Sequence, residues 1–209
     1  MYIPKAFHVD DRAELVAFMR AHNFATLVTS GQAGMAAATL PLTIHDDGAT
    51  LRVVGHLAKA NPQSKELDAT EGLILFQGPH AYVSPAWYEA RESVPTWNYL
   101  AVHVYGRLRA IHFDDSPAEI DTLLAGLIAQ HEPGYQAQWD ALPDRFRDGM
   151  RRGIVGFELI VDRLEGKYKL SQNRSIADQA TVAAALSASL DADEQATGAA
   201  MRQLQEKQP

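Results

Sequence analysis

Two short stretches carry the side chains best suited to hold an anion. The first is GHLAKANPQ, residues 55–63, in which His56 and Lys59 offer donors and Asn61 precedes Pro62. Asn is a favoured N-cap and Pro fits the first helical position, so a helix is expected to begin there. Helix N-termini bind phosphate, and Lys59 would add a positive charge. The same residues also describe a commoner case, a capped helix beside a solvated lysine.

The second stretch is KYKLSQNR, residues 167–174, with six hydrogen-bonding side chains in eight residues. Strand alternation would direct Lys167, Lys169 and Ser171 to one face of a sheet. A polar surface hairpin would have the same composition. Two separate basic clusters in an acidic chain favour a ligand that carries a phosphate more than either cluster does alone.

An aromatic stretch lies between these clusters, at residues 76–106. It holds two of the three tryptophans and four of the seven tyrosines, and Pro79, Pro85 and Pro95 interrupt it. Each proline favours extended backbone at the residue before it, so we expect a stiff, non-helical excursion between two strands. Such a stretch suits a ring-shaped ligand, a subunit interface or an aromatic core. Its apolar part, residues 80–97, predicts a homodimer because a monomer would expose it to water.

Composition and missing motifs exclude several other functions. The 209 residues contain no cysteine, so thiol nucleophiles, disulfides and thiolate zinc sites are absent. No catalytic motif appears, and His80 and His103 have no carboxylate partner in register, so we expect neither catalytic residues nor a metal site. A net charge of −7 without a basic recognition helix argues against direct DNA binding. No apolar run suggests a secretory signal or a membrane span, which predicts a cytoplasmic protein.

The elements that position these clusters follow from periodicity and capping signals. A helix should begin at Asp10 or Asp11, and three strands joined by short turns should form an antiparallel meander, with an open edge or a bulge at Pro41. The expected strands are 24–30, 35–44, 50–56, 72–77, 96–112 and 154–164. Further helices are expected at 116–131, 143–152, 176–190 and 193–205. This order predicts a mainly β protein, an antiparallel barrel decorated by α-helices.

Several blocks of the chain resemble one known family. The blocks MYIPKAF, FATLVTS, GHLAKANPQ, FQGPHAYVSPAWY, VPTWNYLAVHVYGRLR and IVGFELIVDRLEGKYKLSQNR occur in the order seen in PaiB-type FMN-binding negative transcriptional regulators. The resemblance runs from Met1 to about Arg174. It implies an FMN-binding split β-barrel with Greek-key-like strand order, related to the pyridoxamine-phosphate oxidases. It also implies a domain at residues 1–174, a helical tail at 175–209 and a homodimer with FMN between the subunits.

The resemblance also implies the residues that would contact the flavin. The phosphate would lie at Lys59 and Asn61 with His56 nearby, and Gln77 would meet the ring edge. The ring would rest on residues 39–41 of the second strand and on the backbone of residues 26–29 of the first. The other subunit would close the groove with residues of the second cluster. The full set is Thr39, Leu40, Pro41, His56, Lys59, Asn61, Gln77, Lys169, Gln172 and Arg174.

Four positions depart from the family pattern. Thr39 replaces a usual histidine, and Ser64 stands where a bulky aromatic often follows the Asn-Pro-Gln run. In the run of residues 84–89, Ala86 replaces a serine and Glu89 replaces a proline. The change at Thr39 removes a contact expected in the flavin groove.

The resemblance predicts a flavoprotein that acts as a transcriptional regulator without strong affinity for DNA of its own. One alternative is an FMN-dependent oxidoreductase, since a flavin needs little catalytic help from protein side chains. Another is a dimeric binding module that holds no flavin.

Overall fold

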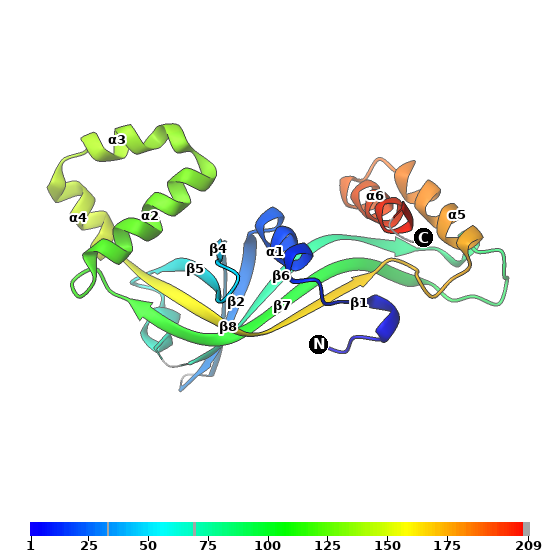
Figure 1. Cartoon of the computed structure of the whole chain (residues 1–209), viewed down its shortest axis with the longest axis horizontal. Coiled ribbons are helices and arrows are strands. Elements are labelled where there is room, and N and C mark those ends of the chain that lie inside the picture. Colours follow the sequence, from blue (N-terminus) through cyan, green and yellow to red (C-terminus); the bar gives the residue numbers. More distant parts are fainter. Residues whose placement is uncertain (33, 69, 207–209) are drawn as a thin grey trace. The chain divides into compact units, whose positions relative to one another are not determined.

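The structure is a computed structural model that describes residues 1–32, 34–68 and 70–206. The described residues form eight strands, six α-helices and four short 3-10 helices (Figure 1). The strands are β1 (His8–Val9), β2 (Phe24–Gly31), β3 (Gly34–Pro41), β4 (Thr43–Asp46), β5 (Leu51–Ala58), β6 (Glu71–Val83), β7 (Thr96–Ile111) and β8 (Ile154–Lys169). The α-helices are α1 (Arg12–Ala21), α2 (Pro117–His131), α3 (Gln136–Ala141), α4 (Asp144–Arg152), α5 (Ile176–Ser187) and α6 (Ala192–Glu206). The 3-10 helices are η1 (Lys5–Phe7), η2 (Pro62–Glu66), η3 (Pro85–Trp87) and η4 (Pro133–Tyr135).

The chain divides into two compact units, each made of separate stretches. Unit 1 comprises Met1–Leu15, Gln77–Val102 and Glu165–Pro209, and unit 2 comprises Val16–Phe76 and His103–Leu164. Strands β6, β7 and β8 each contribute residues to both units.

The sheet has the strand order β3-β2-β6-β7-β8-β5-β4, with β1 paired to β8. The pairs β2/β3, β2/β6, β4/β5, β5/β8 and β1/β8 are antiparallel. The predicted antiparallel, mainly β architecture with helical decoration is therefore confirmed. The long strand predicted at 96–112, the hairpin that begins at residue 24 and the helices α1, α2, α4, α5 and α6 are also confirmed.

The predicted meander of three strands is wrong. The chain from Met35 to Ile44 is not one strand but two, β3 and β4, and they lie at opposite ends of the strand order. Pro41 has no N–H to continue the ladder, and the Leu42 N–H donates to the Asn23 carbonyl at 2.9 Å. The chain therefore leaves β2 at this point, and β4 pairs with β5 instead. The open edge expected at Pro41 is confirmed, because β3 is the first strand of the sheet.

Two other local predictions need correction. The helix expected after Asn61 is only η2, a 3-10 helix of five residues. The aromatic excursion is shorter than expected, because β6 continues past Pro79 to Val83 and β7 resumes at Thr96. The short, polar helix α3 lies between α2 and α4 and was not expected from the sequence.

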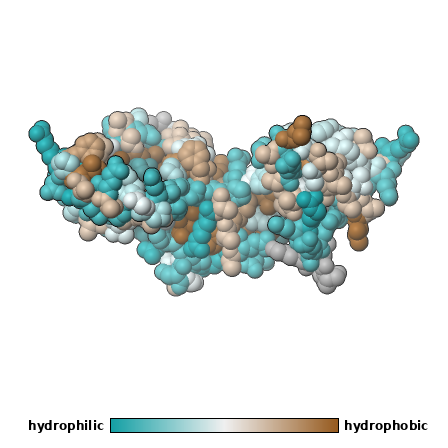
Figure 2. Space-filling view, turned by 90° about the horizontal axis from the view of Figure 1, so that it is seen from above, coloured by the Kyte–Doolittle hydropathy of each residue, from teal (hydrophilic) through white to brown (hydrophobic). Residues whose placement is uncertain are grey.

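Each unit has its own buried core. Unit 2 buries strand residues such as Leu27, Ile74, Phe157 and Leu159, together with Ile120 of α2. Unit 1 has a separate core, which includes Val83, Leu100, Val182, Leu186 and Met201. The face of the molecule shown in Figure 2 is mostly hydrophilic, with small separate hydrophobic spots.

Candidate functional site

The outer face of the β2–β3 hairpin in unit 2 is open and built from small or apolar side chains. The cross-strand pairs on this face are Phe24–Pro41, Thr26–Thr39, Val28–Ala37 and Ser30–Met35. Phe24 and Met35 are 68% and 81% exposed, although large apolar side chains are normally covered. Leu73 and Leu75 of β6 lie beside Val28 and Thr26 and extend the face. An exposed face of small or apolar side chains is suited to a planar ring or a second protein surface.

The residues predicted to lie beneath the flavin ring divide between the two faces of this hairpin. The Thr39 hydroxyl lies 3.0 Å from the Thr26 hydroxyl and is exposed on the outer face, and Pro41 lies on the same face. The Leu40 side chain points the other way and is 6% exposed in the core. Only the backbone of Leu40 is therefore available to a ligand on the outer face.

Much of the GHLAKANPQ stretch is held by the protein itself. The Asn61 side chain accepts a hydrogen bond from the Gln63 N–H at 3.0 Å, so it caps η2. The Gln63 side-chain amide donates to the Thr29 hydroxyl at 3.1 Å and lies 3.4 Å from the Leu27 and Ala36 carbonyls. Asn61 and Gln63 thus anchor η2 to β2 and β3. A single 3-10 turn lacks the macrodipole expected of a full helix, so the helix-dipole argument for phosphate binding does not apply here.

Lys59 and His56 remain available to a ligand. Lys59 follows β5, and its N–H donates to the Gly153 carbonyl at 2.8 Å. Among the described residues its ammonium has no ion pair or hydrogen bond. His56 is half-buried, and its Nδ1 is buried without a hydrogen-bond partner. Burial lowers the pKa of His56, so the neutral ring is favoured.

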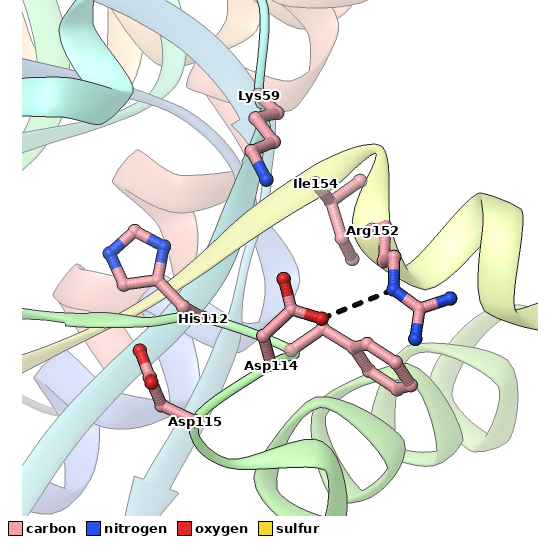
Figure 3. Close-up of a pocket in the computed structure, with 7 residues that line it drawn as sticks. Lys59, His112, Asp114, Asp115, Arg152 and Ile154 are labelled. Carbon is pink, nitrogen blue, oxygen red and sulfur yellow. Dashed lines mark hydrogen bonds and ion pairs between the residues drawn. The ribbon is translucent and has the colours of Figure 1, made fainter.

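The ammonium of Lys59 lies in an open cavity of about 420 Å³ (Figure 3). The cavity is lined by Lys59, His112, Phe113, Asp114, Asp115, Arg152 and Ile154. Arg152 Nε lies 3.1 Å from Asp114 Oδ1, so that pair is neutralised. The sequence analysis missed His112 and the two aspartates, although a run of polar residues directly after a long strand is a usable signal. The cavity lining carries the positive charges of Lys59 and Arg152 and the negative charges of Asp114 and Asp115. Because Arg152 is paired with Asp114, Lys59 is the group that can attract an anion.

The second predicted cluster, residues 167–174, lies in unit 1, and most of its side chains also form hydrogen bonds within the protein. Lys169 Nζ donates to the Thr96 hydroxyl at 2.5 Å and to the Trp97 carbonyl. Gln172 uses both ends of its amide within its own loop, accepting from the Leu170 N–H at 2.7 Å and donating to the Tyr168 carbonyl at 2.5 Å. Gln172 therefore shapes the loop.

Two other predicted flavin-site residues of unit 1 have side chains that are more available to a ligand. The Arg174 guanidinium lies 4.2 Å from the centre of the Tyr88 ring and has no ion pair among the described residues. Gln77 is exposed on β6. Because the residues predicted to contact FMN fall in both units, their joint contact with one flavin stays a prediction.

No group of three or more His, Asp or Glu side chains that could hold a metal occurs in the part of the chain that the structure describes. Nor does any helix within the described ranges have the length and apolarity to cross a membrane.

Comparisons with known proteins identify the family. Residues 1–163 match the family model described as "Putative FMN-binding domain". The chain is 39% identical over 183 residues to the protease synthase and sporulation protein PAI 2 of Bacillus subtilis, and the match covers 87% of each protein. The family match includes the hairpin, His56, Lys59, Asn61 and Gln77, and it ends before Lys169.

Solved structures share the fold. An FAD- and heme-binding protein from Mycobacterium smegmatis superimposes with a TM-score of 0.56 at 16% identity, over 82% of this chain and 78% of that one. A flavocytochrome from Azotobacter vinelandii gives a TM-score of 0.52 at 17% identity, over 80% and 72%. The expected split β-barrel is thereby confirmed. The chain belongs to the PaiB-type family of FMN-binding split-barrel proteins.

Proposed function

We propose that this protein binds FMN, with the isoalloxazine ring against the outer face of the β2–β3 hairpin and the phosphate at Lys59. The observation that carries the proposal is the family match over residues 1–163, which includes both features. Two details of the structure fit it. The hairpin face is exposed at Thr39 and Ala37, and the ammonium of Lys59 has no partner among the described residues. The flavin, when bound, would supply redox chemistry, and the protein would orient it.

FMN, rather than FAD, is the flavin that fits these residues. A terminal phosphate is a compact dianion that one ammonium can hold, whereas FAD needs room for a pyrophosphate and an adenosine.

The test is a titration of FMN and riboflavin into wild type, Lys59→Ala and Asp115→Asn. Lys59→Ala is expected to weaken FMN binding by about 1.5–3 kcal/mol, the range for a hydrogen bond to a charged group, and to leave riboflavin binding unchanged. Asp115→Asn removes a negative charge from the same cavity and should strengthen FMN binding. Equal affinity of wild type for FMN and riboflavin would contradict the phosphate assignment. If wild type binds neither flavin, the whole proposal fails.

We also propose that the protein is a homodimer in which the hairpin face is covered by a second copy. The support is the exposure of Phe24 and Met35 at the two ends of that face. Sedimentation should give a dimer at micromolar concentration, and Ala37→Glu should shift it toward monomer because it places a charge in an apolar interface. A stable wild-type monomer would contradict this proposal.

The regulatory role implied by the family would then be exerted without direct DNA binding. Three of the four arginines of α4 are poor candidates for phosphate contacts, because Arg147 pairs with Asp144, and Arg151 and Arg152 pair with neighbouring aspartates. A gel-shift assay at physiological salt should show no sequence-dependent binding by the pure protein. Oxidation of NAD(P)H by the FMN-loaded protein would instead favour an oxidoreductase.

A further inference from the structure

Unit 1 contains three cations for which the described residues provide no anionic partner. Lys167, Lys169 and Arg174 come from β8 and the loop after it, and none of them forms an ion pair among the described residues. The Lys167 ammonium donates to the Tyr2 carbonyl at 3.1 Å and lies 5.3 Å from the Tyr99 ring centre. Lys167 is only 8% exposed. A buried positive charge without a counter-charge is unfavourable, so a nearby anion would stabilise the cluster.

The cluster retains unused hydrogen-bond donors. Lys169 uses two of its three N–H groups, on Thr96 and the Trp97 carbonyl, which leaves one free. The Arg174 guanidinium stacks on Tyr88 and makes no hydrogen bond within the described residues. Burial, and then the positive charges of Lys167 and Arg174, lower the pKa of Lys169. An anion between Lys169 and Arg174 would relieve that repulsion.

Aromatic groups adjoin these donors. Trp97, whose carbonyl accepts from Lys169, is 53% exposed. Its ring centre lies 6.0 Å from that of Tyr82 and 6.1 Å from that of His80, on the neighbouring strand β6. Tyr88, beneath Arg174, is 8% exposed, and its hydroxyl is buried without a hydrogen-bond partner. Trp97 thus presents an exposed ring for stacking, and its own backbone carbonyl contacts the Lys169 ammonium.

We propose that Lys169 and Arg174, supported by Lys167, form a second binding site for a small aromatic anion, a ring bearing a carboxylate or phosphate that stacks on Trp97. Lys167, Lys169 and Arg174 lie beyond residues 1–163, the part that matches the FMN-binding family model, whereas Trp97 lies within that part. The site uses residues of unit 1 alone, and the proposed position of FMN uses Lys59 and the β2–β3 hairpin of unit 2. It therefore does not depend on the proposed position of FMN.

The test is calorimetric titration of the full chain, with and without FMN, using two probes: adenosine 5′-monophosphate for aromatic phosphates and benzoate for aromatic carboxylates. Adenosine supplies a ring without charge, and inorganic phosphate supplies charge without a ring. At least one probe should bind about tenfold more tightly than adenosine or inorganic phosphate. Whichever probe binds identifies the charged group that the site accepts.

Variants locate the binding. Lys169→Gln and Arg174→Gln should each weaken probe binding by about 10-fold to 100-fold, and Trp97→Ala should weaken it about 10-fold. Two control variants should leave probe binding unchanged. They are Lys59→Ala in unit 2 and Lys5→Gln, which changes an exposed lysine of unit 1. Thermal melting of each variant confirms folding, and Arg174→Lys serves as a milder substitution if Arg174→Gln is unstable.

Two results would overturn the proposal. One is the absence of saturable binding of both probes. The other is a loss of FMN affinity in Lys169→Gln and Arg174→Gln without any probe binding, which would assign these residues to the flavin. Failure of FMN to bind wild type affects the proposed function but not this site, because the probes are also titrated without FMN.

Discussion

The Gln63 side-chain amide donates to the Thr29 hydroxyl at 3.1 Å, and both side chains are buried. This contact joins the η2 turn that follows Lys59 to the inner face of β2. We expect Gln63→Ala to lower the free energy of unfolding by about 1–3 kcal/mol, because it leaves buried acceptors unpaired. Thr29→Val should lower the free energy of unfolding by less in the Gln63→Ala variant than in wild type, because the partner of the hydroxyl is already missing. Urea denaturation of the two single variants and the double variant measures this coupling, and additive losses would show that the two residues act independently.

Ser171 offers a test that separates backbone strain from hydrogen bonding. Its φ is +67°, and its hydroxyl exchanges hydrogen bonds of 2.9 and 3.2 Å with the buried Asn98 side chain. Ser171→Ala should destabilise unit 1 by about 1–3 kcal/mol because Asn98 loses a partner. Ser171→Gly loses the same hydrogen bonds but relieves the left-handed backbone, so it should be up to about 1 kcal/mol less destabilising than Ser171→Ala. Equal denaturation midpoints for the two variants would contradict the strain argument.

Burial of His56 predicts that stability depends on pH. Its folded-state pKa lies below the ordinary value of 6.5, so the unfolded state binds more protons at pH values just below 6.5. Stability should therefore fall as the pH drops below 6.5. Burial lowers the pKa of His22 and of His45 as well, and these residues add to the same trend. Urea denaturation at pH 7.5 and 5.5 should give a smaller stability difference for His56→Gln than for wild type. If His56→Gln shows as large a stability difference between the two pH values as wild type, the effect belongs to other groups. His8→Gln, which changes an exposed histidine, is the control and should behave like wild type.

Arg151 holds the helices between β7 and β8 together. Its guanidinium lies 2.7 Å from an Asp121 carboxylate oxygen of α2 and 3.1 Å from an Asp148 oxygen of α4. It also lies 5.9 Å from the centre of a Trp139 ring in α3. Arg151→Ala should reduce the stability of unit 2 by about 1–3 kcal/mol and increase proteolysis within residues 112–153. Arg145→Ala, at an exposed position of the same helix, should behave like wild type. Equal proteolysis rates for the two variants would argue against this role of Arg151.

The sequence predicted the elements whose signals are local. The Asp11–Glu14 spacing predicted the start of α1, and the Asp11 side chain does accept from the Glu14 N–H at 3.0 Å. The β2–β3 hairpin and α2 were predicted for the same reason, since turn residues and apolar periodicity fixed them within a short stretch. Short α3 has too little apolar periodicity to be distinguished from a loop.

Long-range pairing could not be predicted in this way. Nothing near Leu42 indicates that the next residues cross to the other end of the strand order, because the partners of β4 lie in β5. The η2 turn was mistaken for a full helix because its anchor, Gln63, bonds to residues of β2 and β3 distant in sequence. The residue types of both basic clusters were recognised, but their internal partners were not. Lys169 bonds to Thr96 across 73 residues, and Gln172 bonds within its own loop.

The pairing of β1 with β8 has a consequence for synthesis on the ribosome. His8 lies opposite Lys167, so the first residues of unit 1 wait for partners translated more than 150 residues later. Unit 2 is complete once Leu164 has emerged, whereas unit 1 also requires α5 and α6. Cotranslational folding should therefore begin in unit 2, while the nascent segments of unit 1 remain unpaired and open to chaperones until α5 and α6 have emerged.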